Sequence, residues 1–136
     1  MKSIVTFSRK AFLPVIVLAF FVATLASCSK SGNVIGPSGQ ALTFTMGGQQ
    51  VQNGYLFNFK SNENITLTKI VVSLPAQNFT DSIIVQNQQF QANTQVDFPY
   101  EYTGVQRGQQ WSFKFSGAFT ANNTPFTDVT SQYTIP

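Results

Sequence analysis

Apolar and polar residues alternate along most of this chain from residue 41 onward. Successive side chains of a strand point to opposite faces, so this period of two predicts strands with one buried face. The alternation is clearest at Trp111, Phe113 and Phe115, with polar residues between them. Turn residues separate seven such runs, at 41–46, 51–60, 65–74, 82–86, 95–103, 110–119 and 126–135.

The number and spacing of these runs predict an all-β, immunoglobulin-like β-sandwich of about seven strands over residues 41–136. We expect Gly47-Gly48 to break the chain between the first two strands. Pro99 suits an edge strand or a bulge, because proline donates no hydrogen bond to a sheet. Runs 95–103 and 126–135 are the predicted sheet edges, to which a partner segment adds through its backbone.

The aromatic residues divide into predicted core and predicted exposed rings. A small domain without disulfides needs large apolar side chains, and the alternating aromatics provide them. The expected core rings are Phe57, Phe98, Phe113, Phe115 and Trp111, and we expect Tyr100 and Tyr102 to be buried too. Phe79, Phe119 and Phe126 lie in predicted loops, and they are the candidate ligand-contact aromatics. The alternative for these three is that their rings fill the core.

The N-terminal residues follow another pattern. Basic residues at positions 2, 9 and 10 precede an apolar run over 11–25, shorter than the roughly 20 residues that a membrane-spanning helix needs. This run ends in Leu25-Ala26-Ser27-Cys28. The arrangement resembles the signal peptide and lipobox of a bacterial lipoprotein. The alternatives are an uncleaved anchor helix and a secreted protein whose cysteine is incidental.

The lipoprotein resemblance implies a lipid anchor. It implies that the Cys28 thiol takes a diacylglyceryl group, that the bond between Ser27 and Cys28 is cut, and that Cys28 carries the fatty acids, such as palmitate. Residues 1–27 would then be removed, and residues 28–40, rich in Ser and Gly, would form a flexible tether. The non-acidic Ser29 implies sorting to the outer membrane of the cell envelope, with the side that the protein faces left open.

Charge and composition exclude several function classes. After residue 27 the chain has five basic and five acidic side chains, so it offers no basic surface for nucleic acid. The chain has no histidine, which excludes Ser-His-Asp catalysis and imidazole-bound zinc. Asp97 and Glu101 share a strand face but lie about 13 Å apart along it, too far for a glycosidase pair. Asp81 and Asp128 are expected to be solvated carboxylates rather than calcium ligands. We therefore predict no enzyme, cofactor or metal.

Two further resemblances concern the domain itself. Residues 104–115, a Gly-containing loop followed by an alternating aromatic strand, resemble the late loop and strand of fibronectin type III and other immunoglobulin-like domains. Asp81-Ser82-Ile83 resembles the short O-glycosylation motif of Bacteroidota, which makes Ser82 a candidate modification site.

The sequence thus predicts a lipid-anchored envelope lipoprotein with a non-catalytic structural, adhesion or protein-interaction role. Its partners would be the membrane, through its acyl chains, and an envelope protein. The alternative is a surface glycan-binding module, because aromatic rings flanked by Asn and Gln are used to bind sugars.

Overall fold

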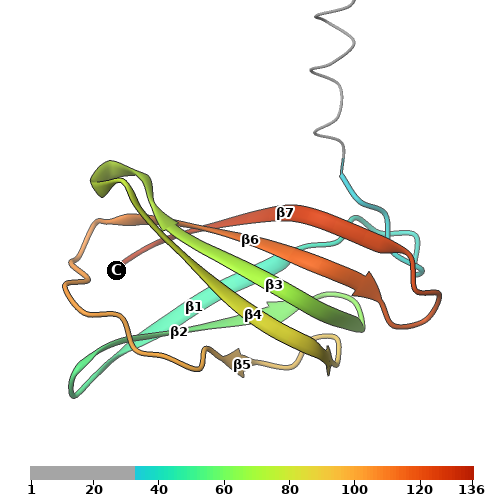
Figure 1. Cartoon of the computed structure of the whole chain (residues 1–136), viewed down its shortest axis with the longest axis horizontal. Helices are drawn as coiled ribbons and strands as arrows, with labels where there is room; N and C mark the ends of the chain where they lie inside the picture. Colours follow the sequence, from blue (N-terminus) through green and yellow to red (C-terminus); the bar gives the residue numbers. More distant parts are fainter. Residues whose placement is uncertain (1–32) are drawn as a thin grey trace, which may run out of the picture. The chain divides into compact units, whose positions relative to one another are not determined.

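The computed structural model describes residues 33–136, and Val34–Pro136 form one compact unit. Two antiparallel sheets pack face to face in this unit (Figure 1). A 3-10 turn, η2 (Pro75–Gln77), links the third and fourth strands. The strands are β1 (Phe44–Val51), β2 (Gly54–Ser61), β3 (Ile65–Leu74), β4 (Phe79–Phe90), β5 (Val96–Asp97), β6 (Gln110–Phe119) and β7 (Pro125–Thr134).

The strand order confirms the predicted all-β, immunoglobulin-like sandwich of about seven strands. One sheet has the order β1-β2-β5 and the other β4-β3-β6-β7. The first, second and fifth strands share one sheet and the third, sixth and seventh the other, as in immunoglobulin domains. The fourth strand differs from the constant-type arrangement, because β4 pairs with β3. The predicted edges, at β5 and β7, are edges of the two sheets, and β1 and β4 are the other two.

Aromatic rings from both sheets fill the core. Phe57 of β2 lies at its centre, 5.0 Å from Phe113 and 5.1 Å from Trp111 between ring centroids. Phe44 stacks on Phe115 across the sheets at 3.8 Å. Such ring pairs stabilise a core by about 1 kcal/mol beyond the surface that they bury. All five predicted core rings are buried, as is Tyr102, which confirms those assignments.

The predicted break at Gly47-Gly48 is wrong, because both glycines lie inside β1. A Cβ at Gly48 would collide with the ring of Tyr55, and one at Gly47 would lie 2.6 Å from the side-chain oxygen of Asn58. The glycines therefore make room for side chains of β2. The turn lies at Gln52-Asn53, between Val51 and Gly54, which pair with each other at the end of the hairpin.

The folded unit starts earlier than the predicted domain boundary at residue 41. Ile35 pairs with Ala41, and the Gly36 amide donates to the Gln40 carbonyl at 2.8 Å. The Ser38 amide and hydroxyl both donate to the carboxylate of Glu63, which fixes this loop to the domain. Residues 34–40 are therefore part of the folded unit, and the rest of the predicted tether, residues 28–32, lies outside the described residues.

A row of bulges crosses the four-stranded sheet. The register of β3 shifts at Thr68 against both of its neighbours. The Thr68 hydroxyl donates to the Ser116 carbonyl, and the Asp128 amide donates to the Ser116 hydroxyl, both at 3.1 Å. Asn87 and Asp128, on the two outer strands, have φ values of 51° and 54° at the same level. Bulges increase local bending, so the sheet changes direction along this row.

Candidate functional site

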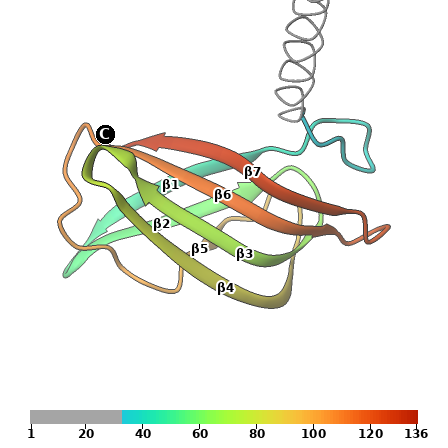
Figure 2. The same ribbon diagram turned by 45° about the horizontal axis from the view of Figure 1, so that its top comes forward.

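The two long sides of the sandwich differ. On one side β1 and β7 are in contact, and the Ser131 hydroxyl donates to the Phe44 carbonyl at 2.7 Å. Tyr55 and Tyr133 add a hydroxyl–hydroxyl hydrogen bond between the sheets at 3.1 Å. On the other side β4 and β5 are the outer strands, and a groove lies between them. Figure 2 shows β4 as the outer strand beside β3.

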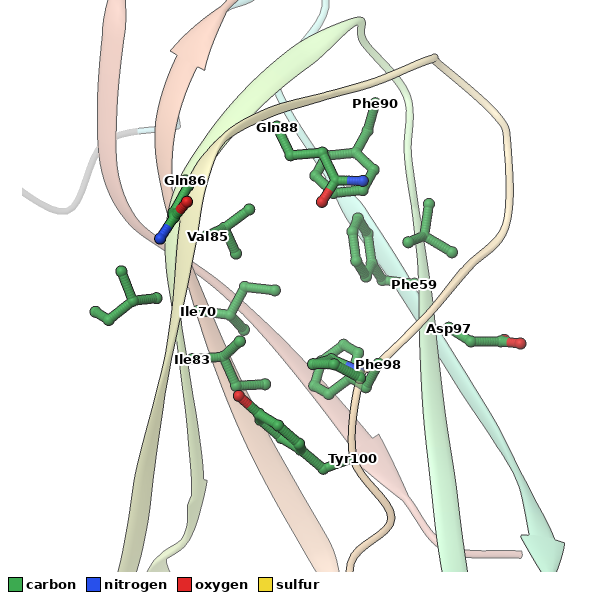
Figure 3. Close-up of a pocket in the computed structure, with 13 residues that line it drawn as sticks. Phe59, Ile70, Ile83, Val85, Gln86, Gln88, Phe90, Asp97, Phe98 and Tyr100 are labelled. Carbon is green, nitrogen blue, oxygen red and sulfur yellow. The ribbon is translucent and has the colours of Figure 1, made fainter.

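The groove begins as a hollow of about 410 Å³. In Figure 3, Ile83 and Val85 form one wall, and Phe59 and Phe98 face them from the other sheet. The floor is apolar because core residues form it, and Phe59, Ile83 and Phe98 are each less than 5% exposed. Asp97 lies on the rim and points away from the hollow (Figure 3).

A second hollow of about 370 Å³ continues along the same side. Tyr100 lines both hollows, so they form one groove along β4. Phe79, Asp81 and Glu101 line the second hollow, together with the edge of Trp111. We refer to the two hollows together as the β4 groove. A groove that is apolar at one end and acidic at the other has the mixed lining typical of binding sites.

The backbone opposite β4 is irregular. Residues 95–103 were predicted to form one strand, but only Val96–Asp97 do, with an isolated pairing of Tyr102 to Tyr55. Pro99 lies between these pairings and has no amide hydrogen to donate. Tyr100 lines both hollows and is 53% exposed, so its predicted burial is wrong.

One hydrogen bond ties the two walls of the second hollow together. The hydroxyl of Tyr102 donates to the Asp81 carboxylate at 3.2 Å. Burial raises the pKa of Tyr102 well above its usual value, and the negative charge of Asp81 raises it further. Burial, with the hydrogen bond to Tyr133, likewise raises the pKa of Tyr55 to about 12. Both phenols therefore stay neutral at physiological pH.

β4 is a long edge strand whose pairing with β3 is regular from Phe79 to Ile84. It has twelve residues, pairs only with β3, and contains no lysine, arginine or proline. Sheet edges of natural proteins usually carry such residues because they discourage pairing with another strand. Among the described residues, the strongly exposed large apolar side chains are Ile35, Phe79, Ile84 and Tyr100, and all except Ile35 line the β4 groove.

The three candidate ligand-contact aromatics occupy different environments. Phe79 is 39% exposed and lines the second hollow. Phe119 and Phe126 are 1% and 4% exposed, with ring centroids 5.4 Å apart, so their expected exposure is wrong. Phe119 ends β6 and Phe126 lies near the start of β7, where both extend the alternation of their strands and point into the core. They fill the core, which was the alternative interpretation.

The other predicted positions are dispersed. Ser82 is exposed on β4, and its amide donates to the side chain of Asp81 at 2.8 Å; its glycosylation stays a prediction. Asp128 lies at the bulge of β7, away from the β4 groove. Within residues 33–136 no three acidic, histidine or cysteine side chains gather into a metal-binding group.

The anchor residues cannot be placed on this structure. The predicted signal peptide (residues 1–27), its cleavage position at Ser27 and the lipidation site Cys28 lie outside the described residues. The part of the chain that the structure describes contains no helix with the length and hydrophobicity needed to cross a membrane.

Sequence reasoning did not identify Ile84 and Tyr100 as site residues. Ile84 is 70% exposed, next to the buried Ile83 in β4. The consecutive apolar residues at 83–85 were a usable indication, since one of two adjacent strand residues must point away from the core. For Tyr100, the neighbouring Pro99 indicated that regular alternation would end there.

Comparison of the chain with protein-family models, with curated proteins and with solved structures finds no match.

Proposed function

We propose that this protein is a lipid-anchored envelope lipoprotein whose sandwich domain is a non-catalytic protein-interaction module. The observation that carries the interaction role is the β4 groove, which combines an unpaired strand edge with exposed apolar side chains. Contiguous apolar surface of this kind is typical of interaction sites in folded proteins. The envelope location, on the outer membrane, rests on the lipobox resemblance at Cys28.

The anchor is tested by metabolic labelling with a palmitate analogue. Wild-type protein should incorporate the label, and Cys28→Ala should lose it, because that thiol is the proposed acylation site. Cys28→Ala should also leave the membrane fraction, since stable attachment requires two or more acyl chains. Equal labelling of both proteins would contradict the anchor.

The interaction role is tested by photo-crosslinking in the cells that make the protein. A photoreactive amino acid at position 84 should give a protein adduct, because this position is 70% exposed beside the β4 groove. Position 35 is the matched control, since Ile35 is 60% exposed and lines neither hollow. Adducts of the same yield at both positions, or none at 84, would contradict a partner on this side.

A surface glycan-binding role is the second candidate. It is favoured by the second hollow, where Phe79 and Tyr100 are exposed close to Asp81 and Glu101. Rings that stack on sugars beside acceptor oxygens are a common sugar-binding arrangement. A screen of envelope polysaccharides against wild-type protein and Tyr100→Ala tests this candidate. Saturable binding that Tyr100→Ala abolishes and Ile35→Thr retains would favour the glycan role.

A further inference from the structure

We propose that the β4 groove binds an extended polypeptide strand that adds to the free edge of β4, with apolar residues at alternate positions and a lysine or arginine at one end. This inference rests on the proposed interaction function and specifies the chemistry of its partner. Three independent features lead to it, namely the backbone, the side chains and the charges of the groove.

The backbone of β4 can hydrogen-bond an added strand. From Phe79 to Ile84 this strand pairs regularly with β3 on one side only. Alternate residues of an antiparallel strand turn their amide and carbonyl groups to opposite sides, so the outer edge carries backbone groups that β3 does not pair. The Ser82 amide already donates to the Asp81 side chain at 2.8 Å, and an added strand would have to replace that bond or bypass it. The facing segment does not pair with β4, because Val96–Asp97 and Tyr102 pair with β2 in the other sheet.

The side chains favour a guest with alternating apolar residues. On the inner side of β4, the half-buried Val85, Phe90 and Val96 line the first hollow, above the buried Ile83, Phe59 and Phe98. On the outer side, Ile84 is 70% exposed. A strand that lies along β4 points its side chains alternately to these two faces. One set of its apolar side chains would fill the hollow of about 410 Å³ and cover the half-buried residues that line it.

The charges favour a basic guest. Asp81 and Glu101 line the second hollow, and no lysine or arginine of the described residues lines either hollow. Asp97 adds negative charge at the rim of the first hollow, although its side chain points away from it. Lys69 pairs in register with Ile84, but it alternates with the buried Ile70 and so lies on the outer face of the sheet. Because Asp81 and Glu101 both line the second hollow, the basic residue of the guest is expected at the Phe79 end.

The test selects random twelve-residue peptides from a display library against full-length protein in detergent, with Ile84→Thr protein for counter-selection. We expect enriched peptides to alternate apolar and polar residues and to contain lysine or arginine. The best peptide is then synthesised with N-methyl groups on its odd or its even residues. One series should lose affinity more than tenfold and the other less than threefold, because only alternate amides face β4.

Protein variants locate the binding. Tyr100→Ala and Ile84→Thr should each lower the affinity for the selected peptide about tenfold, whereas Ile35→Thr should leave this affinity unchanged. Glu101→Gln should weaken it about threefold and reduce the effect of raising NaCl from 50 to 500 mM, because rim charges attract a basic guest through screened interactions.

Each of the following results would overturn the proposal. Equal losses in the two N-methyl series would show binding without strand addition. Enriched peptides without alternation, or an absence of enrichment, would reject an extended guest. If the full-length protein forms dimers and Ile84→Thr dissociates them, the occupant of the groove is a second copy of the chain. If the protein binds a polysaccharide and Tyr100→Ala abolishes this binding, the occupant is a glycan. If position 84 forms crosslinks but the peptide selection fails, the interaction role is supported and strand addition is rejected.

Discussion

The two sides of the sandwich have the same kinds of residues but different contacts between the sheets. On the β1–β7 side, Ser131 bonds to the Phe44 carbonyl and Tyr55 to Tyr133, above the stacked rings of Phe44 and Phe115. On the β4–β5 side the described cross-sheet hydrogen bond is that of Tyr102 to Asp81, beside a groove with an apolar floor. The first side is closed by contacts between the sheets, and the second carries the exposed side chains of Phe79, Ile84 and Tyr100.

The largest expected effect is on the closed side. Phe44→Ala removes a ring stacked at 3.8 Å on Phe115 and should lower the free energy of unfolding by about 3–5 kcal/mol. Tyr100→Ala, on the open side, should lower it by less than about 1 kcal/mol, because that ring is already half exposed. Urea unfolding followed by the fluorescence of Trp111, the single tryptophan, measures both. Equal losses would remove the distinction between the sides.

High pH should weaken both tyrosine bonds. The folded state holds Tyr55 and Tyr102 protonated above their usual pKa of about 10, whereas the unfolded chain releases these protons near pH 10. Their contribution to stability is therefore complete below pH 10 and decreases from pH 10 to about 12, by up to about 1.4 kcal/mol per pH unit for each tyrosine. We expect urea unfolding from pH 8 to 11.5 to show that the free energy of unfolding falls less steeply with pH in Tyr55→Phe and Tyr102→Phe than in the wild type. The exposed Tyr100→Phe is the control, and unchanged slopes would contradict the assignment.

The hydrogen bond between β1 and β7 should contribute less. Ser131→Ala removes the donor to the Phe44 carbonyl and should cost about 1 kcal/mol of unfolding free energy. Ser82→Ala, a change of the same size on the open edge, should cost less than about 0.5 kcal/mol, since Ser82 is exposed. A larger cost for Ser82→Ala would mean that β4 is held more tightly than its contacts indicate.

The smallest effect should come from the most exposed apolar side chain. Ile84→Thr should change the free energy of unfolding by less than about 0.5 kcal/mol, because Ile84 is 70% exposed and threonine keeps its strand propensity. Thermal unfolding checks this result. A loss above 1 kcal/mol would show that Ile84 stabilises the fold rather than serving a partner.

The alternation of residues predicted the core and the sandwich because burial of one face dominates each strand. Runs 65–74 and 110–119 coincide with β3 and β6, the central strands of their sheet. The prediction was wrong where backbone geometry outweighs alternation. Gly47 and Gly48 lie within a strand because side chains of β2 occupy the volume that a Cβ would take. Pro99 ends the alternation on which the predicted burial of Tyr100 was based.

The candidate site was harder to predict than the core. Phe119 and Phe126 flank a turn, but the side chain of each still points to the buried face of its strand. The β4 groove depends on which strand pairs with which, and a single period-two pattern carries no information on pairing. The prediction of edges at β5 and β7 was correct, yet only the position of β4 beside β3 shows which edge is left open.

The row of bulges places an upper limit on the length of a strand that β4 accommodates. Regular pairing along β4 is interrupted after Ile84, because Val85, Gln86 and Asn87 lie opposite the single residue Thr68, and it resumes at Gln88. The uninterrupted edge from Phe79 to Ile84 spans about 20 Å. The proposed guest strand would therefore gain backbone hydrogen bonds over about six residues, and extending it beyond that length should add little affinity. If the proposed strand addition takes place, the domain would therefore select short extended motifs rather than long strands.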